Sequence, residues 1–457
     1  MLSIEFFAIL IISLLLYWLL PKQKYRNLFL CGSSLLFIWL LDHQSLVVVL
    51  VLSIISYLFA QLIYRNPKVR WIHAAGVIVV LLALLIFKYL GFLGGVFTAL
   101  YMFLESLPHF KIHYMLLPLG ISYITFKHIS YLTDVKWRLV GPGNFVDFLL
   151  YSSLFTIFLA GPIERFERLE PQLNNPRIAF RRDFLSIGTR RIVTGLFKKL
   201  VIADWIGFFI SFVWSNPTQY HPAIALAAVF AYAFQIYYDF AGYSDIAIGA
   251  SQLFGLHIME NFNKPYLAKN ISDFWRRWHI SLSDWIRDYL FFPLSALGKS
   301  KLWRIFFVPV MAMGICGLWH GAEARYLVWG VWHGLGLSVY QGYQLLRHKL
   351  DQTKKEKLDA IMAKISWPLT YLFVVLTWLS FRSFGLPLAK HIFLRAEAVL
   401  YLPLLFLLLM LFSQLWGKLH FIKHFKLPWR PAYNLYLLLL IGICHCAMNM
   451  DFIYAAF

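Results

Sequence analysis

Apolar runs of about the length needed to cross a lipid bilayer recur along the whole chain, and they constrain its fold more than any other feature. A transmembrane helix needs about 20 mostly apolar residues. Runs of that length or slightly shorter lie at residues 2–20, 27–41, 46–63, 72–90, 114–132, 145–160, 192–214, 223–240, 306–318, 326–346, 367–381, 399–416 and 435–450. They predict an all-α, polytopic membrane protein with about eleven to thirteen transmembrane helices.

The composition supports a lipid environment. Sixty per cent of the 457 residues are hydrophobic and 14% are charged, whereas a soluble domain averages about 45–50% apolar and about 25% charged residues. No stretch is long and polar enough to form a separate soluble domain. The chain is therefore expected to be a single integral membrane domain.

Basic residues gather in short connections between the apolar runs, and the formal net charge is +20. Basic short loops mark the cytoplasmic side, so residues 347–364 and 418–430 are predicted to be cytoplasmic. Such loops contact anionic membrane lipids, and the same surface could also attract an acidic cytosolic partner. Between about residues 136 and 301, basic residues occur in nearly every connection, which predicts re-entrant or surface-lying segments there.

Four cysteines, Cys31, Cys316, Cys444 and Cys446, all lie within apolar runs. They are expected to act as small buried hydrophobic residues. Cys444 and Cys446 flank His445 and could alternatively bind a metal, but no second cysteine pair lies near them. No metal site is therefore predicted. The sequence also contains no serine-hydrolase motif, no phosphate-binding loop and no nucleic-acid-binding motif.

The most informative single residue is His320, within the stretch GLWHG at 317–321. An apolar run that is typical of a buried helix precedes it, and another follows. Ionisable side chains at membrane depth are costly and rare unless they are paired or take part in chemistry. His320 is therefore the leading candidate for a catalytic residue.

A second candidate lies in the segment at 274–293, FWRRWHISLSDWIRDYLFFP. On a helical wheel its tryptophans share one face and its charged residues the other. This pattern predicts a helix that lies in the membrane interface or lines a water-accessible cavity. His279 falls at the edge of the aromatic face, where it could be either a packing residue or a catalytic one. Asn270 or Ser272 would start the helix.

An ordered set of motifs resembles the membrane-bound O-acyltransferase family. It looks most like the bacterial branch that O-acetylates alginate and other exported polysaccharides and that transfers D-alanine to teichoic acid. The motifs are PLGISY at 118–123, YLTD at 131–134, AGPI at 160–163, YDFAGYSD at 238–245, ENFNKPY at 260–266, the segment at 274–293, GLWHG at 317–321 and FIY at 452–454. The resemblance implies that residues 111–457 form the catalytic core around a central tunnel, and that residues 1–110 add N-terminal transmembrane helices.

The resemblance implies that His320 and His279 are the two catalytic histidines. His320 would act as the general base and His279 as a positioning or electrostatic helper. The other candidates, which would line the substrate tunnel, are Trp319, His333, Asn261, Tyr266, Trp278 and Asp288. Asp245 and Asp288 are expected to pair with nearby arginines, Asp288 with Arg287 or Arg276.

The implied function is a membrane-embedded O-acyltransferase of the bacterial inner (cytoplasmic) membrane. It would pass an acyl group, in the first place acetyl, from acyl-CoA or an acidic acyl carrier protein to an exported polysaccharide or to an extracytoplasmic partner acyltransferase. No permanently bound cofactor and no nucleic acid are expected. D-alanyl transfer to teichoic acid or lipopolysaccharide is the alternative within the enzyme class, while a transporter or a non-catalytic scaffold would be a different class.

Overall fold

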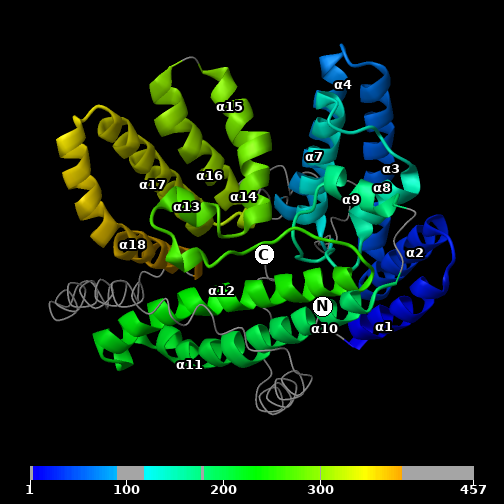
Figure 1. Ribbon diagram of the computed structural model, residues 1–457, viewed down its shortest axis with the longest axis horizontal. Helices are drawn as coiled ribbons and strands as arrows, with labels where there is room; N and C mark the ends of the chain where they lie inside the picture. The colour runs from blue at the N-terminus through cyan, green and yellow to red at the C-terminus, as the bar shows by residue number, and fades with distance from the viewer. Residues whose placement is uncertain (1–3, 90–117, 176–179, 299, 383–457) are drawn as a thin grey trace, which may run out of the picture. The chain divides into compact units, whose positions relative to one another are not determined.

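The computed structural model describes residues 4–89, 118–175, 180–298 and 300–382. Within these ranges every regular element is a helix (Figure 1), apart from one isolated antiparallel bridge between Phe262 and Trp278. The all-α prediction is therefore confirmed for this part of the chain. The apolar runs at 399–416 and 435–450, the pair Cys444 and Cys446, and the FIY motif lie outside the described residues.

The chain forms two compact units. One comprises residues 1–192 and 243–259, and the other comprises residues 193–242 and 260–457. Helices α10 (Arg182–Leu196) and α12 (Pro222–Leu253) each contribute residues to both units. The division into N-terminal helices at 1–110 and a catalytic core at 111–457 is a different one, and it stays a prediction.

The first unit is built mainly from helices that pack along one another. Helix α7 lies against both α3 and α4, and α8 lies against α2. The Asp42 carboxylate caps the start of α3 by accepting hydrogen bonds from the backbone N–H groups of Gln44 and Ser45. Apart from α10 and α12, the helices of this unit are α1 (Ile4–Leu19), α2 (Gln23–Leu41), α3 (His43–Arg65), α4 (Arg70–Leu84), η1 (Leu85–Tyr89), α7 (Ile121–Trp137), α8 (Phe145–Ser153) and α9 (Phe166–Leu173).

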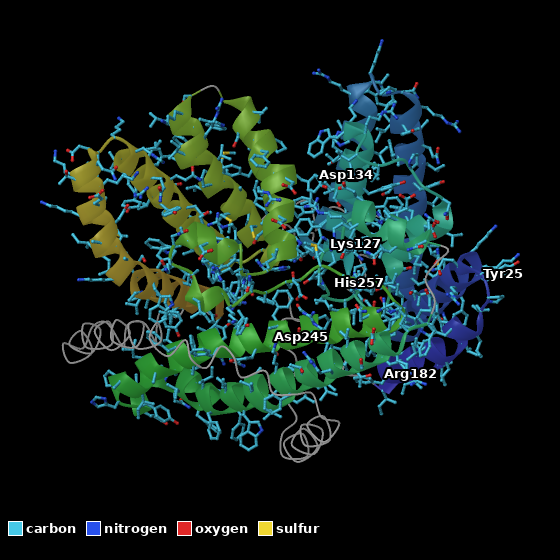
Figure 2. The ribbon with its side chains drawn as sticks, in the orientation of Figure 1. Tyr25, Lys127, Asp134, Arg182, Asp245 and His257 are labelled. Atoms are coloured by element: carbon cyan, nitrogen blue, oxygen red, sulfur yellow. The ribbon has the colours of Figure 1, made fainter. Side chains whose placement is uncertain are left out.

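Two buried charged side chains of the first unit, Lys127 and Asp245, have polar partners. The Lys127 ammonium donates to the backbone carbonyl of Tyr151 at 3.0 Å, inside the unit, whereas Tyr25 lies at its surface (Figure 2). The carboxylate of Asp245 accepts from Arg191 at 3.0 Å, as the sequence predicted. Pairing of this kind offsets the cost of burying charge.

The second unit contains both candidate catalytic histidines. Within it, α16 and α17 form the most extensive helix–helix contact, and α18 packs on α17. Apart from α10 and α12, its helices are η2 (Phe197–Ala203), α11 (Asp204–Ser215), η3 (Pro217–Gln219), η4 (Pro265–Leu267), α13 (Ile271–Trp275), α14 (Ile280–Ile286), η5 (Arg287–Phe291), α15 (Phe292–Leu297), η6 (Trp303–Phe307), α16 (Val308–His320), α17 (Ala324–His348) and α18 (Gln352–Arg382).

Five helical stretches among the described residues are long and apolar enough to cross a membrane. They are His43–Arg65, Arg70–Tyr89, Pro222–Leu253, Trp303–His320 and Gln352–Arg382. Several helices between residues 136 and 301 are much shorter: α8 has 9 residues, α13 has 5 and α14 has 7. Since a spanning helix needs about 20 residues, these elements agree with the expectation of non-spanning segments in the middle of the chain.

Candidate active site

The segment that carries His279 is interrupted, and the prediction of one continuous amphipathic helix over 274–293 is wrong. Helix α13 ends at Trp275 and α14 begins at Ile280. His279 lies between them in a left-handed backbone conformation, with φ 43° and ψ 55°. That conformation costs a residue other than glycine about 1–2 kcal/mol, and such strain tends to occur at functional sites.

Residues 261–263 hold the break in place. The backbone carbonyl of Asn261 accepts from the N–H of Ile280 at 3.0 Å, and its side-chain oxygen accepts from the hydroxyl of Ser281 at 2.6 Å. Phe262 forms the isolated bridge with Trp278. The backbone on both sides of His279 is therefore fixed by a segment that is distant in sequence, and this explains why local helix periodicity did not reveal the break.

Helix α13 begins as the sequence predicted. The side-chain oxygen of Asn270 caps it by accepting from the N–H of Asp273 at 2.8 Å. The short helix then directs Trp275 and Trp278 into the interior of the unit, where each is less than a tenth exposed. The aromatic face of the segment thus packs against protein, which favours the interpretation that it lines an internal site.

The position of His320 depends on the close packing of α16 against α17. His320 is the last residue of α16 and is 4% exposed. A Cβ on Gly317 would lie 2.1 Å from the carbonyl oxygen of Tyr326, and one on Gly330 would lie 2.2 Å from that of Met313. Because no other residue type fits at these distances, the glycines allow the two helices to approach so closely.

His279 and His320 border the same small cavity in the second unit. Its other lining residues are aromatic or aliphatic: Trp275, Trp278, Leu282, Trp329, Trp378 and Phe381. The space between them admits no water-sized sphere. In this conformation the two histidines therefore lie in a dry, closed chamber, and the tunnel expected around them is not open at this point.

Aromatic rings surround His320. The centroid of its imidazole lies 4.7 Å from that of Trp319, 5.3 Å from that of Trp329 and 5.2 Å from that of Phe381. All three pairs are edge-to-face, an arrangement that holds a ring firmly. Trp319 itself does not border the cavity. Its contact with the His320 ring therefore supports that ring without lining the chamber.

His333 lies next to this chamber without lining it. It is fully buried, and its Nε2 is 2.9 Å from the hydroxyl of Thr377. Its ring lies 4.9 Å from that of Trp329, which in turn contacts His320. The observed role of His333 is to pack beneath Trp329.

The remaining sequence candidates lie in different places. Trp278 borders the chamber, whereas Asn261 acts on the backbone beside it. The ring of Tyr266 packs on Phe274, 6.4 Å away, and its hydroxyl donates to the carbonyl of Ala233. Asp288 pairs with Arg287 at 2.8 Å, as expected, on a partly exposed surface.

Sequence reasoning missed two lining residues on α18 and one on α17. Trp378 and Phe381 are three residues apart, so they share a face of α18. Trp329 stands four residues before His333 on one face of α17. Their aromatic spacing was a usable signal, but it equally fits an ordinary helix core.

Burial determines the charge of His279. The loss of solvent lowers the pKa of this imidazole to about 3, so the ring is neutral at physiological pH. A neutral ring can form hydrogen bonds to a reacting group but supplies no positive charge. Over the described residues, no group of three or more His, Cys, Asp or Glu side chains could hold a metal ion.

Comparison with known proteins gives a family match over most of this region. Residues 119–381 match the model of the membrane-bound O-acyltransferase family. The matched range includes the chamber, the strained backbone at His279 and the closely packed pair of helices α16 and α17.

Three curated relatives illustrate the similarity. A probable alginate O-acetylase of Pseudomonas syringae pv. tomato is 37% identical over 407 residues, which cover 86% of this chain and 73% of the relative. A peptidoglycan O-acetyltransferase of Helicobacter pylori is 31% identical, with 84% and 77% covered. A teichoic acid D-alanyltransferase of Bacillus subtilis is 31% identical, with 62% and 73% covered.

Proposed function

Because the chain belongs to the membrane-bound O-acyltransferase family and is therefore a multi-pass membrane O-acyltransferase, we propose that it acylates a polysaccharide of the bacterial cell envelope. The acyl group is acetyl, since two of the three relatives described above are named for O-acetyl transfer to alginate or peptidoglycan. The donor is a thioester that reaches the protein from the cytosol.

The observation that carries this proposal is the convergence of His279 and His320 on one dry chamber. His320 takes the proton of the acceptor hydroxyl as its oxygen attacks the thioester carbonyl. The C–S bond then breaks, and His320 returns the proton to the leaving thiolate. One alcohol and one thioester thus give one ester and one thiol, with no change of oxidation state.

His279 acts on the reacting groups through hydrogen bonding. The neutral ring can orient the acceptor hydroxyl or hold the proton-bearing nitrogen of His320. Its backbone is held in the left-handed conformation by the hydrogen bond that Asn261 accepts from Ile280. The ring is therefore positioned before substrate arrives. Trp278 and Trp329 form part of the surrounding wall, which must shift to admit the acyl group.

The closed chamber favours transfer over hydrolysis. Because no water-sized sphere fits beside the histidines, water cannot compete with the acceptor hydroxyl for the thioester until the chamber opens. Substrates must therefore open the site as they bind. This coupling suits an enzyme whose two substrates come from opposite faces of a membrane.

The proposal includes two partners. The donor is acyl-CoA or an acidic acyl carrier protein, attracted by the basic connections that carry most of the +20 charge. The acceptor is the polysaccharide itself or the serine of an extracytoplasmic acyltransferase that completes the transfer. The protein would reside in the cytoplasmic membrane, where a cytosolic donor and an exported acceptor can both reach it.

D-alanyl transfer is the second candidate. It is favoured by the similarity to the teichoic acid D-alanyltransferase of Bacillus subtilis, although the match covers less of this chain than the two O-acetylating relatives do. Mass analysis of envelope polymers from cells with and without the protein separates the two, because acetyl and D-alanyl esters differ in mass. A transporter or scaffold would leave purified protein without any turnover.

The decisive experiment compares two histidine variants in purified protein supplied with radiolabelled acetyl-CoA and an acceptor. His320→Ala should abolish thioester turnover and envelope acylation while membrane insertion stays normal. His348→Ala, at the exposed end of α17, is the matched control and should retain full activity. Normal acylation by the His320 variant would contradict the proposal.

A further inference from the structure

We propose that a pocket between α17 and α18 binds a membrane phospholipid with an anionic headgroup. The pocket belongs entirely to the second unit and is separate from the chamber of His279 and His320. The inference goes beyond the proposed function, because it concerns a second ligand site and does not depend on acyl transfer.

The pocket is large enough for a lipid chain. Its volume is about 790 Å³, within the range of about 300–1,000 Å³ that is usual for small-molecule sites. Helices α17 and α18 form two of its walls, and the residues just before and at the start of α13 form the third. The chamber of the histidines, by contrast, has no space for a water-sized sphere.

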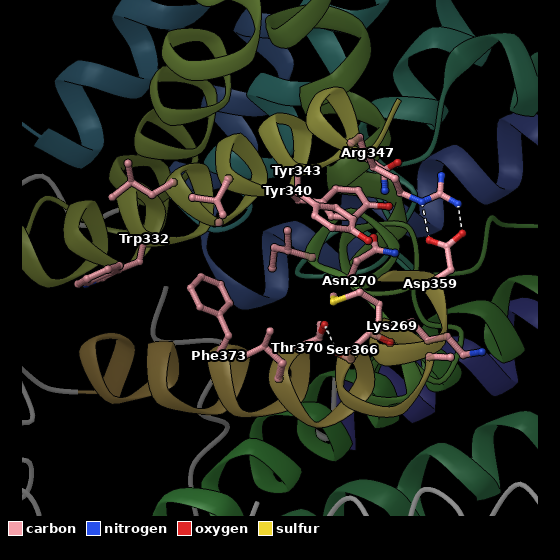
Figure 3. A pocket seen from close by; sticks show the side chains of 18 residues that line it. Lys269, Asn270, Trp332, Tyr340, Tyr343, Arg347, Asp359, Ser366, Thr370 and Phe373 are labelled. Atoms are coloured by element: carbon pink, nitrogen blue, oxygen red, sulfur yellow. Dashed lines mark hydrogen bonds and ion pairs between the residues drawn. The ribbon is translucent and has the colours of Figure 1, made fainter. Parts of the chain in front are cut away.

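The pocket has an apolar end and a polar end (Figure 3). Trp332 and Phe373 lie at one end. The aliphatic side chains of Leu335 and Val339 also line the pocket. Lys269, Asn270, Tyr340, Tyr343 and Arg347 lie at the other. This division matches a phospholipid, in which an apolar chain is joined to a charged phosphate.

The polar end carries one positive charge in excess. Arg347 forms a two-point ion pair with Asp359, at 2.7 Å and 2.5 Å, which joins α17 to α18 and cancels both charges. Lys269 adds a further positive charge and is exposed. A lysine ammonium and two tyrosine hydroxyls are suitable donors for a phosphate oxygen.

The apolar side chains at the mouth favour a lipid over a water-soluble ligand. Trp332 is 51% exposed, Val339 is 69% exposed and Leu369 is 53% exposed. In a multi-pass membrane protein, such side chains contact acyl chains. The adjoining residues 347–364 are predicted to be cytoplasmic, and the cytoplasmic leaflet is the one rich in anionic lipids.

One wall of the pocket adjoins the short helix α13, which precedes His279 in the chain. Lys269, Asn270 and Ile271 line the pocket, and Asn270 caps the helix whose far end carries Trp275. A lipid bound here would therefore stabilise the first turn of α13. Through α13 it would also restrict the movement of the backbone that precedes His279.

The test measures lipid retained by the purified full-length protein. The protein is placed in nanodiscs of phosphatidylcholine with or without phosphatidylglycerol, and retained lipid is measured by native mass spectrometry after mild delipidation. Wild-type protein should retain phosphatidylglycerol in preference to phosphatidylcholine. Val339→Trp places a bulky ring on the pocket lining and should abolish retention, whereas Leu346→Trp, on an exposed position of the same helix outside the pocket, should retain lipid normally.

Two lysine-to-glutamate variants test whether the polar end of the pocket binds the anionic headgroup. Lys269→Glu should weaken phosphatidylglycerol binding by about tenfold, as the loss of one charge-assisted contact implies, while the exposed Lys301→Glu control should leave it unchanged. Equal retention of the two lipids, or equal retention by Val339→Trp and Leu346→Trp, would overturn the proposal. So would a photo-crosslinker at Leu335 that captures peptide from this chain or from a second copy instead of lipid.

Discussion

The rings of Phe240 and His279 meet edge-to-face, with centroids 4.7 Å apart and planes at 83°. Phe240 lies on the long helix α12, and His279 lies in the break between two short helices. Phe240 therefore contacts the imidazole, while Asn261 fixes the backbone that carries it by accepting hydrogen bonds from Ile280 and Ser281. The geometry of the site depends on contacts between segments that are separate in sequence.

Replacing Asn261 with alanine should disable the enzyme more than it unfolds it. The change removes the side-chain oxygen that accepts from Ser281, and an unmatched buried polar group costs about 1–3 kcal/mol. We expect a moderate fall in melting temperature and a loss of acyl transfer of about tenfold or more. Asn263→Ala, in the same segment but exposed, should show neither effect.

Substitutions at His279 should separate the effect of its strained backbone on stability from the effect of its imidazole on acyl transfer. Glycine adopts the left-handed conformation without cost, so His279→Gly should be more stable than His279→Ala by about 1 kcal/mol. Both variants should lose acyl transfer, because both lack the imidazole. Denaturant or thermal unfolding, measured beside thioester turnover, checks both points. Equal stability of the two variants would mean that the left-handed backbone is not retained in solution.

Two glycines one turn apart on α16 form a matched test of helix packing. Gly317→Ala places a Cβ 2.1 Å from a backbone oxygen of α17, so the helices must separate and His320 must move. We expect loss of stability and of activity. At Gly314 the nearest atom would be 3.6 Å away, so Gly314→Ala should be tolerated. Similar melting temperatures for both variants would contradict the observed helix contact.

A buried charge cluster should contribute to the stability of the second unit. The ammonium of Lys199 lies 2.6 Å from a carboxylate oxygen of Asp204 and 2.8 Å from one of Asp239. Lys199→Met leaves two buried carboxylates without their cation, which should cost about 3–5 kcal/mol. The exposed Lys301→Met is the control, and unfolding in detergent is the measurement.

Acid should destabilise the protein partly through His279. Burial lowers the pKa of this ring from 6.5 to about 3, so between these values the unfolded chain binds a proton that the folded chain excludes. Stability should therefore fall as the pH is lowered through this window. His279→Gln should show a shallower fall from about pH 7 to about pH 5 than the wild type does. Identical slopes would show that the ring is solvated.

Sequence alone was sufficient for the fold class, and it singled out His320 as the leading candidate for a catalytic residue. The long apolar runs predicted helices because a lipid-embedded backbone must satisfy its hydrogen bonds internally. An imidazole between two such runs was informative because burying it is costly. Both arguments are local, since they need only the composition of one stretch of chain.

The break at His279, the aromatic wall and the closed state of the chamber were decided by tertiary structure alone. On a helical wheel the stretch at 274–293 is a good amphipathic helix, but the bonds from Asn261 to Ile280 and Ser281 outweigh that local preference. Trp329 reaches His320 from α17 because Gly317 and Gly330 let α16 and α17 pack so closely, and Phe381 reaches it from α18. Interactions between distant segments depend on their packing in space, and no local pattern encodes it.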